Sequence, residues 1–460
     1  MAEAPPPGVS RTTWIAVTAV IVVIVVIVAA LALTGFFAPG DEEDQTIRIG
    51  TILPTTGTLG WLGAPMEDAS DLAAEQINAA GGVLGKDIEL IHCDSQTRPA
   101  QGANCAAKLV YTDRVVAIVG AASSGVSQLV STITLEQEVV LISPASTSPL
   151  FTTFEIERQA ALVAAGAASA SDPVPDEDIP GWFWRTAPSD KLQSQVAGLL
   201  AVAEGWQTFG VLAVNNPYGK GFSELFTDVV VAAGKTVKVW VNYTEEQVSY
   251  ASDLQLIANA DVDAVFAIAY PGDGLTMMQN WEAKTGQTGW GWDWFWSEGL
   301  KSNVFLEELA TANIDVAGIK GTAPLPPAAN FQIFEDAYTA KFDRPSEVFD
   351  PHTYDAVYLV AAAIEMAGEA TSDAVRLNLV DVSSGTGTTV LPGEWDDILT
   401  EIADGNSINY EGASGGVDLN FVGEPLSDYE IWEITGTIAA GFAYTLRETV
   451  ICGVTCAIAP

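Results

Sequence analysis

The chain has 460 residues, enough for two or three domains. Its 59 Asp and Glu residues outnumber its 19 Lys and Arg residues, so the formal net charge is -40. This balance excludes a nucleic-acid-binding surface, because phosphates are bound by clustered Lys and Arg. Excess carboxylates keep a protein hydrated and dispersed, so adaptation to salt is one interpretation of the charge.

The N-terminal segment predicts a membrane anchor. No charged residue occurs between Trp14 and Gly35, and residues 14–35 are long enough to cross a bilayer as a helix. Arg11 precedes this run and acidic residues follow it, so we expect a cytoplasmic tail at residues 1–13 and an acidic tether at residues 36–45. The protein would then be a single-pass protein of the cell membrane, with its binding domain outside the cytoplasm. A cleaved signal peptide is the alternative, although the apolar run exceeds a usual secretory segment.

The four cysteines favour disulfides, because an even number in an extracytoplasmic chain is typical of them. Cys93 ends an expected strand and Cys105 lies in the helix after it, so this pair would close a short loop. Cys452 and Cys456 would clip the C-terminal tail. A zinc site would use the same residues, but His92 is the only histidine near them and the spacing does not match a zinc module. We therefore expect the disulfides Cys93–Cys105 and Cys452–Cys456, and no metal.

Strands and helices alternate after the tether, which predicts α/β architecture with parallel sheets covered on both faces. A first series has expected strands at Ile47–Leu53, Asp87–Cys93, Val115–Val119 and Val139–Ile142, and expected helices at Pro65–Ala80, Ala100–Tyr111 and Ser124–Glu136. A surface loop is expected at Gly166–Pro180, and Trp182–Thr186 opens a second series.

The second series has expected strands at Phe209–Ala213, Thr236–Val241, Val265–Ala269 and Trp294–Ser297. Its expected helices are Leu192–Glu204, Gly219–Ala233, Ser252–Asn259 and Leu275–Lys284. After a turn-rich crossing at Gly321–Pro327, helices resume at Phe331–Phe342 and Thr353–Ala367.

Two hydroxyl-rich turns follow neighbouring strands of the first series, at Gly120–Gly125 and Ser143–Pro149. Parallel strands deliver both turns to the same edge of a sheet, where ligands of open α/β sheets bind. Ser123 and Ser124 stand at the start of a helix, where a hydroxyl and free N–H groups suit a carboxylate. A serine that only caps the helix is the simpler alternative. We interpret the two turns as half of a solute-binding cleft.

Little in the sequence predicts catalysis. Gly412–Gly416 formally fits G-x-S-x-G, but no histidine follows Ser414, and a strand-like segment at Val417–Phe421 stands where the hydrolase motif needs a helix. Gly81–Lys86 is not a phosphate-binding loop, because Asp87 stands where Ser or Thr is needed. We expect a protein that is not an enzyme and that uses no cofactor.

An ordered set of short motifs runs between Ile47 and Glu433. The motifs are Gly50–Gly57 with Gly63 after it, Ala74–Gly85, Gly120–Ser124, Ser143–Pro149, Arg185–Asp190, Asn216–Gly221 and Tyr354–Tyr358. Together they resemble the type I periplasmic solute-binding proteins of branched-chain amino acid (Leu/Ile/Val) ABC transporters. The resemblance implies a periplasmic-binding-protein-like type I fold, with two doubly wound parallel-sheet lobes joined by a three-crossing hinge. It implies discontinuous lobes, at residues 46–187 plus 324–420 and residues 188–323 plus 421–450, with a C-terminal tail at residues 451–460.

The resemblance also implies which residues hold a ligand's head group. Ser124 matches the serine that binds the ligand carboxylate, and Ala145 and Thr147 match the turn that holds an amino acid head group. Glu298 matches the acid that pairs with the ligand ammonium, and such a charge-assisted pair is strong when both partners are desolvated. One exposed acid among many is the simpler interpretation of Glu298.

Aromatic residues are implied for the walls. Tyr218 and Tyr270 match aromatics of the facing lobe. The family often has an aromatic just before the glycine numbered Gly63 here, but Leu62 occupies that position and Trp61 stands one place earlier. Trp61 either forms a wall of the pocket or covers the lobe edge. The tryptophans before Glu298 have core packing as their simpler interpretation.

The resemblance implies a membrane-anchored receptor that captures an amino acid, branched-chain-like, between two lobes and delivers it to an ABC permease and its ATPase. A receptor for an amide or urea, which the same family also includes, is one alternative. The ligand-binding ectodomain of a sensor is another, but the tail at residues 1–13 is too short for a signalling domain, which favours transport.

Overall fold

The computed structural model describes residues 46–164, 181–383, 387–453 and 455–459. The described residues exclude the anchor expected at residues 14–35, its tail and tether, and the whole loop expected at Gly166–Pro180. Within the described ranges, no helix combines the length and the apolar character that a membrane crossing needs.

The first sheet is parallel throughout, in the order β2-β1-β3-β4-β5. Its strands are β1 Thr46–Leu53, β2 Asp87–Asp94, β3 Ala117–Gly120, β4 Val140–Ser143 and β5 Phe183–Arg185. Helices α2 (Gly60–Ala79), α3 (Pro99–Ala107), α4 (Ser124–Glu136) and α5 (Pro149–Ala164) follow its first four strands in turn, and a π-helical turn at Lys108–Asp113 extends α3. We call this sheet, its helices and the segment from α11 to β12 described below the first lobe.

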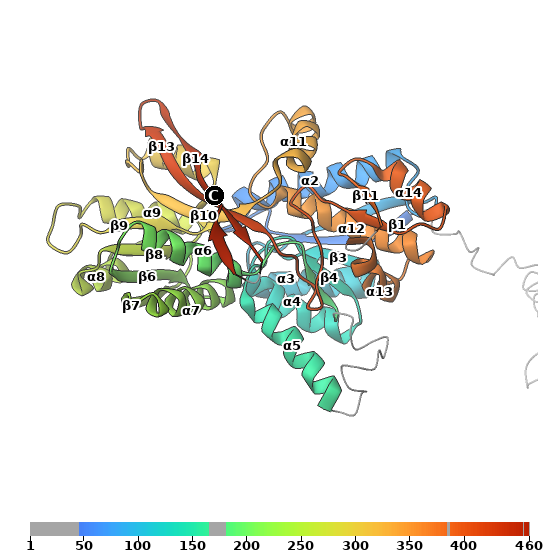
Figure 1. Ribbon diagram of the computed structural model, residues 1–460, viewed down its shortest axis with the longest axis horizontal. Helices are drawn as coiled ribbons and strands as arrows, with labels where there is room; N and C mark the ends of the chain where they lie inside the picture. Colours follow the sequence, from blue (N-terminus) through green and yellow to red (C-terminus); the bar gives the residue numbers. More distant parts are fainter. Residues whose placement is uncertain (1–45, 165–180, 384–386, 454, 460) are drawn as a thin grey trace, which may run out of the picture. The chain divides into compact units, whose positions relative to one another are not determined.

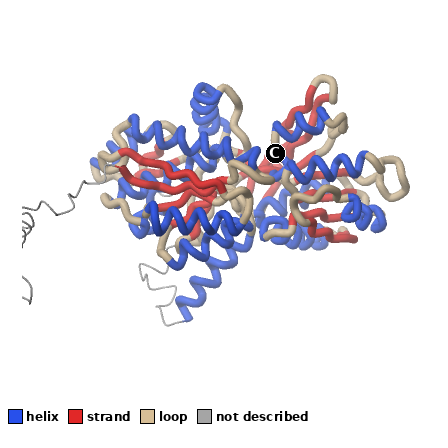
Figure 2. Tube along the Cα trace, turned by 180° about the vertical axis from the view of Figure 1, so that it is seen from behind, coloured by secondary structure: helices blue, strands red, loops and turns tan. Residues whose placement is uncertain are grey.

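Helices cover both faces of the first sheet, and the side chains of its strands divide between two cores. In β3, Ala117 and Val119 pack toward α2 and α12, whereas Ile118 packs toward α3 and α4. This alternation is the two-residue period of a strand with both faces buried. It explains why the central strands are continuous apolar runs. Figure 2 shows the helices on either side of the strands.

The second sheet is mixed, in the order β15-β14-β13-β10-β9-β8-β6-β7. Its parallel part consists of β6 Thr208–Val214, β7 Thr236–Tyr243, β8 Ala264–Ile268, β9 Asp293–Trp296 and β10 Lys320–Leu325. The strands β13 Asp428–Thr437, β14 Gly441–Cys452 and β15 Cys456–Ile458 add an antiparallel extension. The expectation of a purely parallel sheet is therefore wrong for this part. With helices α6 to α10, this sheet forms the second lobe (Figure 1).

The helices of the second lobe are α6 Asp190–Ala203, α7 Pro217–Ala232, α8 Ala251–Ala260, α9 Pro271–Glu282 and α10 Asn303–Thr311, with a 3-10 turn at Glu298–Leu300. The later part of the first lobe consists of α11 Ala328–Phe342, α12 Asp350–Ala367, α13 Ser372–Ser383, β11 Thr388–Val390, α14 Trp395–Ala403 and β12 Ile408–Tyr410. Both lobes thus contain a later return of the chain. The residue boundaries proposed for them stay a prediction.

The described chain passes between the lobes at three places: residues 186–189, 326–327 and 421–427. Each connects a strand end or turn of one lobe to an element of the other. The first crossing contacts the turn that follows β4, because Thr186 N donates to Ser143 O at 3.0 Å.

Several sequence-based boundaries need correction. Helix α2 begins at Gly60 rather than Pro65, so Pro65 lies inside the helix instead of at its start. The strand expected at Trp182–Thr186 does not open a second series, because β5 is the last strand of the first sheet. Val417–Phe421 forms no strand. The sequence analysis predicts no helix where the structure has α5.

Buried Asp355 of α12 explains the G-x-S-x-G sequence as a structural turn. Its carboxylate accepts hydrogen bonds from Tyr410 Oη at 2.8 Å, Ala413 N at 2.8 Å and Ser414 N at 2.7 Å. A Cβ on Gly412 would lie 2.4 Å from the same carboxylate. The glycine is needed for this close approach.

Both expected disulfides are confirmed. Cys93 at the end of β2 is bonded to Cys105 in α3, with Cα atoms 5.7 Å apart. Cys452 and Cys456 join β14 to β15. The zinc alternative is therefore wrong for these four residues.

Gly63 sets how closely the first turns of α2 approach the end of β1. A Cβ on Gly63 would lie 2.0 Å from Pro54 O, which is far inside van der Waals contact. We expect Gly63→Ala to lower the free energy of unfolding by roughly 2 kcal/mol, because overpacking against backbone forces the helix to shift. Chemical denaturation followed by circular dichroism measures this loss.

Gly272→Ala in the first turn of α9 is the matched control, since its Cβ would meet nothing within 4 Å. The denaturation midpoint of this variant should stay the same as that of the wild type or rise slightly. Equal midpoints for the two variants would contradict the proposed contact.

Candidate ligand-binding site

One cavity lies where the carboxyl ends of strands from both sheets meet. Its empty space, part of it open to solvent, is about 360 Å³. It is lined by Leu59, Trp61, Leu62, Ala122, Ser124, Ala145, Thr147, Tyr218, Tyr270, Glu298, Gly299, Val348 and Phe349. Every residue named from the sequence as a ligand contact (Trp61, Ser124, Ala145, Thr147, Tyr218, Tyr270 and Glu298) is in this set. The fold therefore brings them together, and their role in binding stays a prediction.

The first-lobe wall is built from the two hydroxyl-rich turns. Ser124 is the first residue of α4, and Ser123 before it is extended, but the Ser123 side chain accepts no capping hydrogen bond from the helix. Ser124 Oγ instead accepts a hydrogen bond from Ser148 N at 3.4 Å, which connects the two turns. The simpler alternative, a serine that serves only to cap its own helix, does not describe this turn.

Two tyrosines form the facing wall. Tyr218 lies in the first turn of α7, and Tyr270 immediately precedes α9. Their rings stack with centroids 5.9 Å apart. Tyr218 Oη donates to Ser297 Oγ at 2.8 Å, and Asn216 Nδ2 donates to Tyr270 Oη at 3.1 Å. Their orientation is thus fixed before any ligand arrives.

Glu298 is a buried acid in the wall of the second lobe. It is only 2% exposed, so its interpretation as an exposed acid is wrong. Gln193 Nε2 donates to Glu298 Oε2 at 2.7 Å. No ion pair found among the described residues includes Glu298. Burial raises the pKa of Glu298 to about 7, although its contacts with Tyr218 and Gln193 act in the opposite direction.

A second buried acid, Asp190, lies close enough to Glu298 to affect it electrostatically. Its side chain is fully buried. Burial, followed by the charge of Glu298, raises the pKa of Asp190 well above its ordinary value, although its contact with Thr147 and the charge of Arg185 act in the opposite direction. Of the two acids, Glu298 lines the cavity, where a cation beside it would favour its ionised form. The sequence analysis did not single out Asp190 or Gln193 as site residues.

The rest of the lining is apolar. Leu59, Leu62 and Trp61 come from the segment after β1 and the first turn of α2, and Val348 and Phe349 come from the segment before α12. Sequence reasoning missed Val348 and Phe349, because no motif marks a residue that reaches the cavity through a later return of the chain. The tryptophans before Glu298 are core residues, as their simpler interpretation predicted: Trp290, Trp292, Trp294 and Trp296.

Contacts across the cavity mouth join the two lobes. Thr58 Oγ1 donates to Glu245 Oε2 at 2.8 Å, and Ser148 Oγ donates to Pro217 O at 2.9 Å. Arg98 of the first lobe pairs with Glu246 of the second at 3.4 Å. Thr58 precedes Leu59 and Ser148 follows Thr147, so two of these contacts lie next to residues that line the cavity.

The arrangement suits a small solute with an anionic end, a cationic end and an apolar body. The start of α4 and its hydroxyls favour an anion, and the buried carboxylate of Glu298, when ionised, favours a cation. In the part of the chain that the structure describes, no group of three or more His, Cys, Asp or Glu is placed to hold a metal ion.

Comparisons with known proteins agree with this geometry. A family model described as "Periplasmic binding protein" matches residues 46–401. The chain is 26% identical over 399 residues to the chemotactic signal transduction system substrate-binding protein BasB of Halobacterium salinarum, covering 85% of this chain and 87% of the relative. It is 29% identical over 374 residues to the leucine-, isoleucine-, valine-, threonine- and alanine-binding protein of Pseudomonas aeruginosa, covering 78% of this chain and 89% of the relative.

The fold has a solved counterpart. A leucine-binding protein, LivK, of Thermotoga maritima superposes with a TM-score of 0.68 at 19% identity, covering 88% of this chain and 98% of that one. At this identity the likeness establishes the fold. Since the family model spans most of the chain, the protein belongs to the periplasmic binding protein family, with the type I α/β fold.

Proposed function

We propose that this protein captures an α-amino acid with an apolar, branched-chain-like side chain between its lobes and delivers it to an ABC permease with its ATPase. The single observation that carries the proposal is the opposition of two features in one cavity. The hydroxyl-rich turns at Ser124 and Thr147 lie on one side, and the buried, unpaired carboxylate of Glu298 lies on the other. A zwitterion satisfies both.

Each lining residue then has a role in the proposal. Ser124 and the N-terminus of α4 hold the ligand carboxylate, and Thr147 with the carbonyl of Ala145 holds the head group. Glu298 pairs with the ammonium, and Tyr218 and Tyr270 close the head-group end. A ligand that brings its own positive charge removes the penalty of a buried, unpaired acid.

The apolar lining supports the choice of side chain. Trp61, Leu59, Leu62, Val348 and Phe349 offer no charged group, so an aliphatic side chain gains by leaving water. The names of the curated relatives, among them the leucine-, isoleucine-, valine-, threonine- and alanine-binding protein, support the same class. The family's description as binding proteins supports the expectation that the chain is not an enzyme.

A sensory role is the second candidate, and the similarity to BasB, named for a chemotactic signal transduction system, favours it. Both roles use the same ligand-filled cleft, so binding data alone do not separate them. Deletion of the gene in the source cell distinguishes the two roles. A transport role predicts loss of amino acid uptake, whereas a sensory role predicts loss of the behavioural response with uptake retained.

Glu298→Gln tests the amino acid head group. Calorimetry should show binding of L-leucine, L-isoleucine or L-valine to the wild-type chain. The variant should bind the same ligand at least tenfold more weakly, because a hydrogen bond to a charged group contributes about 1.5–3 kcal/mol. Binding of a neutral amide should change much less.

Glu204→Gln is the matched control, since Glu204 pairs with Lys320 at 2.7 Å outside the cavity and its loss should leave affinity unchanged. Binding of an amide or urea, with no binding of any α-amino acid, would overturn the amino acid proposal. Equal losses for amino acid and amide would show that Glu298 is not the ammonium partner.

The affinity should depend on pH with a defined sign. The pKa of Glu298 is about 7 in the ligand-free chain, and a bound ammonium lowers it, so binding requires the ionised form. Affinity for leucine should be full above pH 7 and fall by up to roughly tenfold per unit as the pH drops below 7. Calorimetry between pH 5.5 and 8 measures the slope, and Glu298→Gln should abolish it; a wild-type slope of zero would contradict the assignment.

The anchor at residues 14–35 is the part of the proposal that rests on sequence alone. We expect the full chain to sediment with membranes, and a variant lacking residues 14–35 to leave them, because only the apolar run is long enough to stay in a bilayer. Membrane fractionation with N-terminal sequencing distinguishes an uncleaved anchor from a cleaved signal peptide. A soluble mature chain that starts after residue 35 would establish a cleaved signal peptide instead.

A further inference from the structure

Arg185 is a buried cation that lies beside the ligand cavity without lining it. It is the last residue of β5, immediately before the first crossing, and is only 1% exposed. A cation this deeply buried needs all of its donors satisfied. Its partners therefore show what it holds in place.

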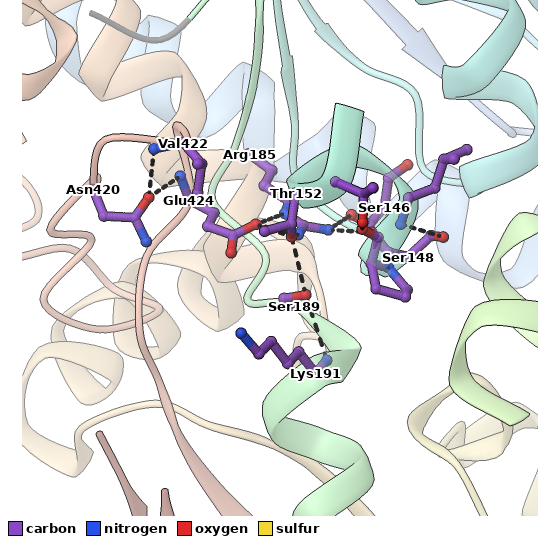
Figure 3. Close-up of polar contacts among 12 residues, drawn as sticks. Ser146, Ser148, Thr152, Arg185, Ser189, Lys191, Asn420, Val422 and Glu424 are labelled. Carbon is purple, nitrogen blue, oxygen red and sulfur yellow. Dashed lines mark hydrogen bonds and ion pairs between the residues drawn. The ribbon is translucent and has the colours of Figure 1, made fainter. Parts of the chain in front are cut away.

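The guanidinium connects two parts of the chain (Figure 3). On one side, Arg185 Nε donates to Glu424 Oε2 at 3.0 Å, and Nη2 pairs with the same oxygen. On the other, Nη1 donates to Ser146 O and to Ser148 O, both at 2.9 Å. Thr152 Oγ1 accepts from Nη2 at 2.8 Å and itself donates to Glu424 at 2.8 Å.

Three consecutive carbonyls of the turn after β4 are thus directed at the crossing segment. Ser146 O and Ser148 O accept from Arg185, and Thr147 O between them accepts from Asp190 N at 2.9 Å. Ser146 O and Thr147 O lie outside the strands and before α5, so without such donors they would be buried and unsatisfied. Ser148 directly precedes α5, so its carbonyl also faces the first turn of that helix, and Arg185 adds a second donor to it. With all three held on one side, the side chain of Thr147 lines the cavity on the other.

We propose that Arg185 is the positioning residue of the binding site: its guanidinium fixes the turn at residues 146–148 so that Ala145 and Thr147 meet the ligand's head group. Glu424 of the third crossing, 8% exposed, neutralises Arg185 and keeps the planar guanidinium in place. The inference rests on the proposed function in one respect, that the cavity takes an amino acid.

Substitutions can distinguish the role of Arg185 from that of Glu424. The side chain introduced by Glu424→Gln still offers an oxygen to the guanidinium, so this variant should keep the turn in place while losing the ion pair. Arg185→Met in the Glu424→Gln background removes the guanidinium donors to Ser146 O and Ser148 O without leaving an unpaired buried acid. Arg185→Lys keeps a charge but cannot span the same four partners from one ammonium.

The test measures the affinity of the full chain for L-leucine by calorimetry, well below the thermal midpoint of each variant. Glu424→Gln should bind within about threefold of wild type. The double variant R185M/E424Q should bind roughly five- to thirtyfold more weakly than E424Q, as expected when a residue acts on a site through others. The affinity of Arg185→Lys should lie between those of E424Q and R185M/E424Q.

Arg376→Met is the control for a loss of stability alone. Arg376 is 8% exposed, pairs with Asp373 in α13 at 3.1 Å and does not line the cavity. Its loss should lower the thermal midpoint and leave affinity unchanged. Affinity of R185M/E424Q equal to that of E424Q, or an equal loss in R376M, would overturn the proposal.

Hydrogen exchange of the ligand-free chain gives a readout that does not depend on the ligand. The backbone amides of residues 145–148 should exchange at least tenfold faster in R185M/E424Q than in E424Q, and no faster in R376M, because only the first variant frees this turn. If wild type binds no amino acid, the proposed function fails, and exchange at this turn alone then decides the role of Arg185. Unchanged exchange would overturn it.

Discussion

Burial of an acid without a cationic side chain beside it is the constraint on which this site depends. An ionised carboxylate in an apolar interior is unfavourable unless a cation or several donors meet it. Gln193 donates to Glu298, and burial nevertheless raises the pKa of Glu298 to about 7. Asp190 nearby is a second, fully buried acid, and the charge of Arg185 partly offsets its burial. A cationic group placed beside Glu298 would offset the cost of its ionised form.

The polar groups can converge because both sheets present the carboxyl ends of their parallel strands to the same cavity. Ser124 and Thr147 follow β3 and β4 of the first sheet, and Tyr218, Tyr270 and Glu298 follow β6, β8 and β9 of the second. The charged and hydroxyl groups are thus carried by short connections on rigid strands. The antiparallel extension β13–β15 lies beyond β10, so it enlarges the second sheet without changing this edge.

The sequence predicts this edge well because local patterns encode it. Alternating apolar strands and amphipathic helices predict the sheet, and α4 has the bounds expected for it. The family resemblance that the ordered motifs carry implies seven residues, all of which line one cavity. What the sequence does not reveal depends on tertiary context. Val348 and Phe349 reach the cavity only because the chain returns to the first lobe, and Asp190 becomes a buried acid only once α6 packs against the site. The predicted start of α2 at Pro65 is wrong because proline most often stands in the first turn of a helix, whereas Pro65 lies inside α2.

Two buried charges solve the same problem at two irregular turns of the first lobe. Backbone groups in a buried turn lack the partners that a sheet or helix provides. At residues 146–148 the groups to satisfy are carbonyls, and Arg185 supplies the donors. At residues 413–414 they are N–H groups, and Asp355 supplies the acceptors. The two turns differ in what they adjoin, because Thr147 of the first turn lines the cavity, whereas Ala413 and Ser414 of the second do not. A buried charge therefore stabilises a turn of the fold at Asp355, whereas at Arg185 it also connects the crossing segments to the wall of the cavity.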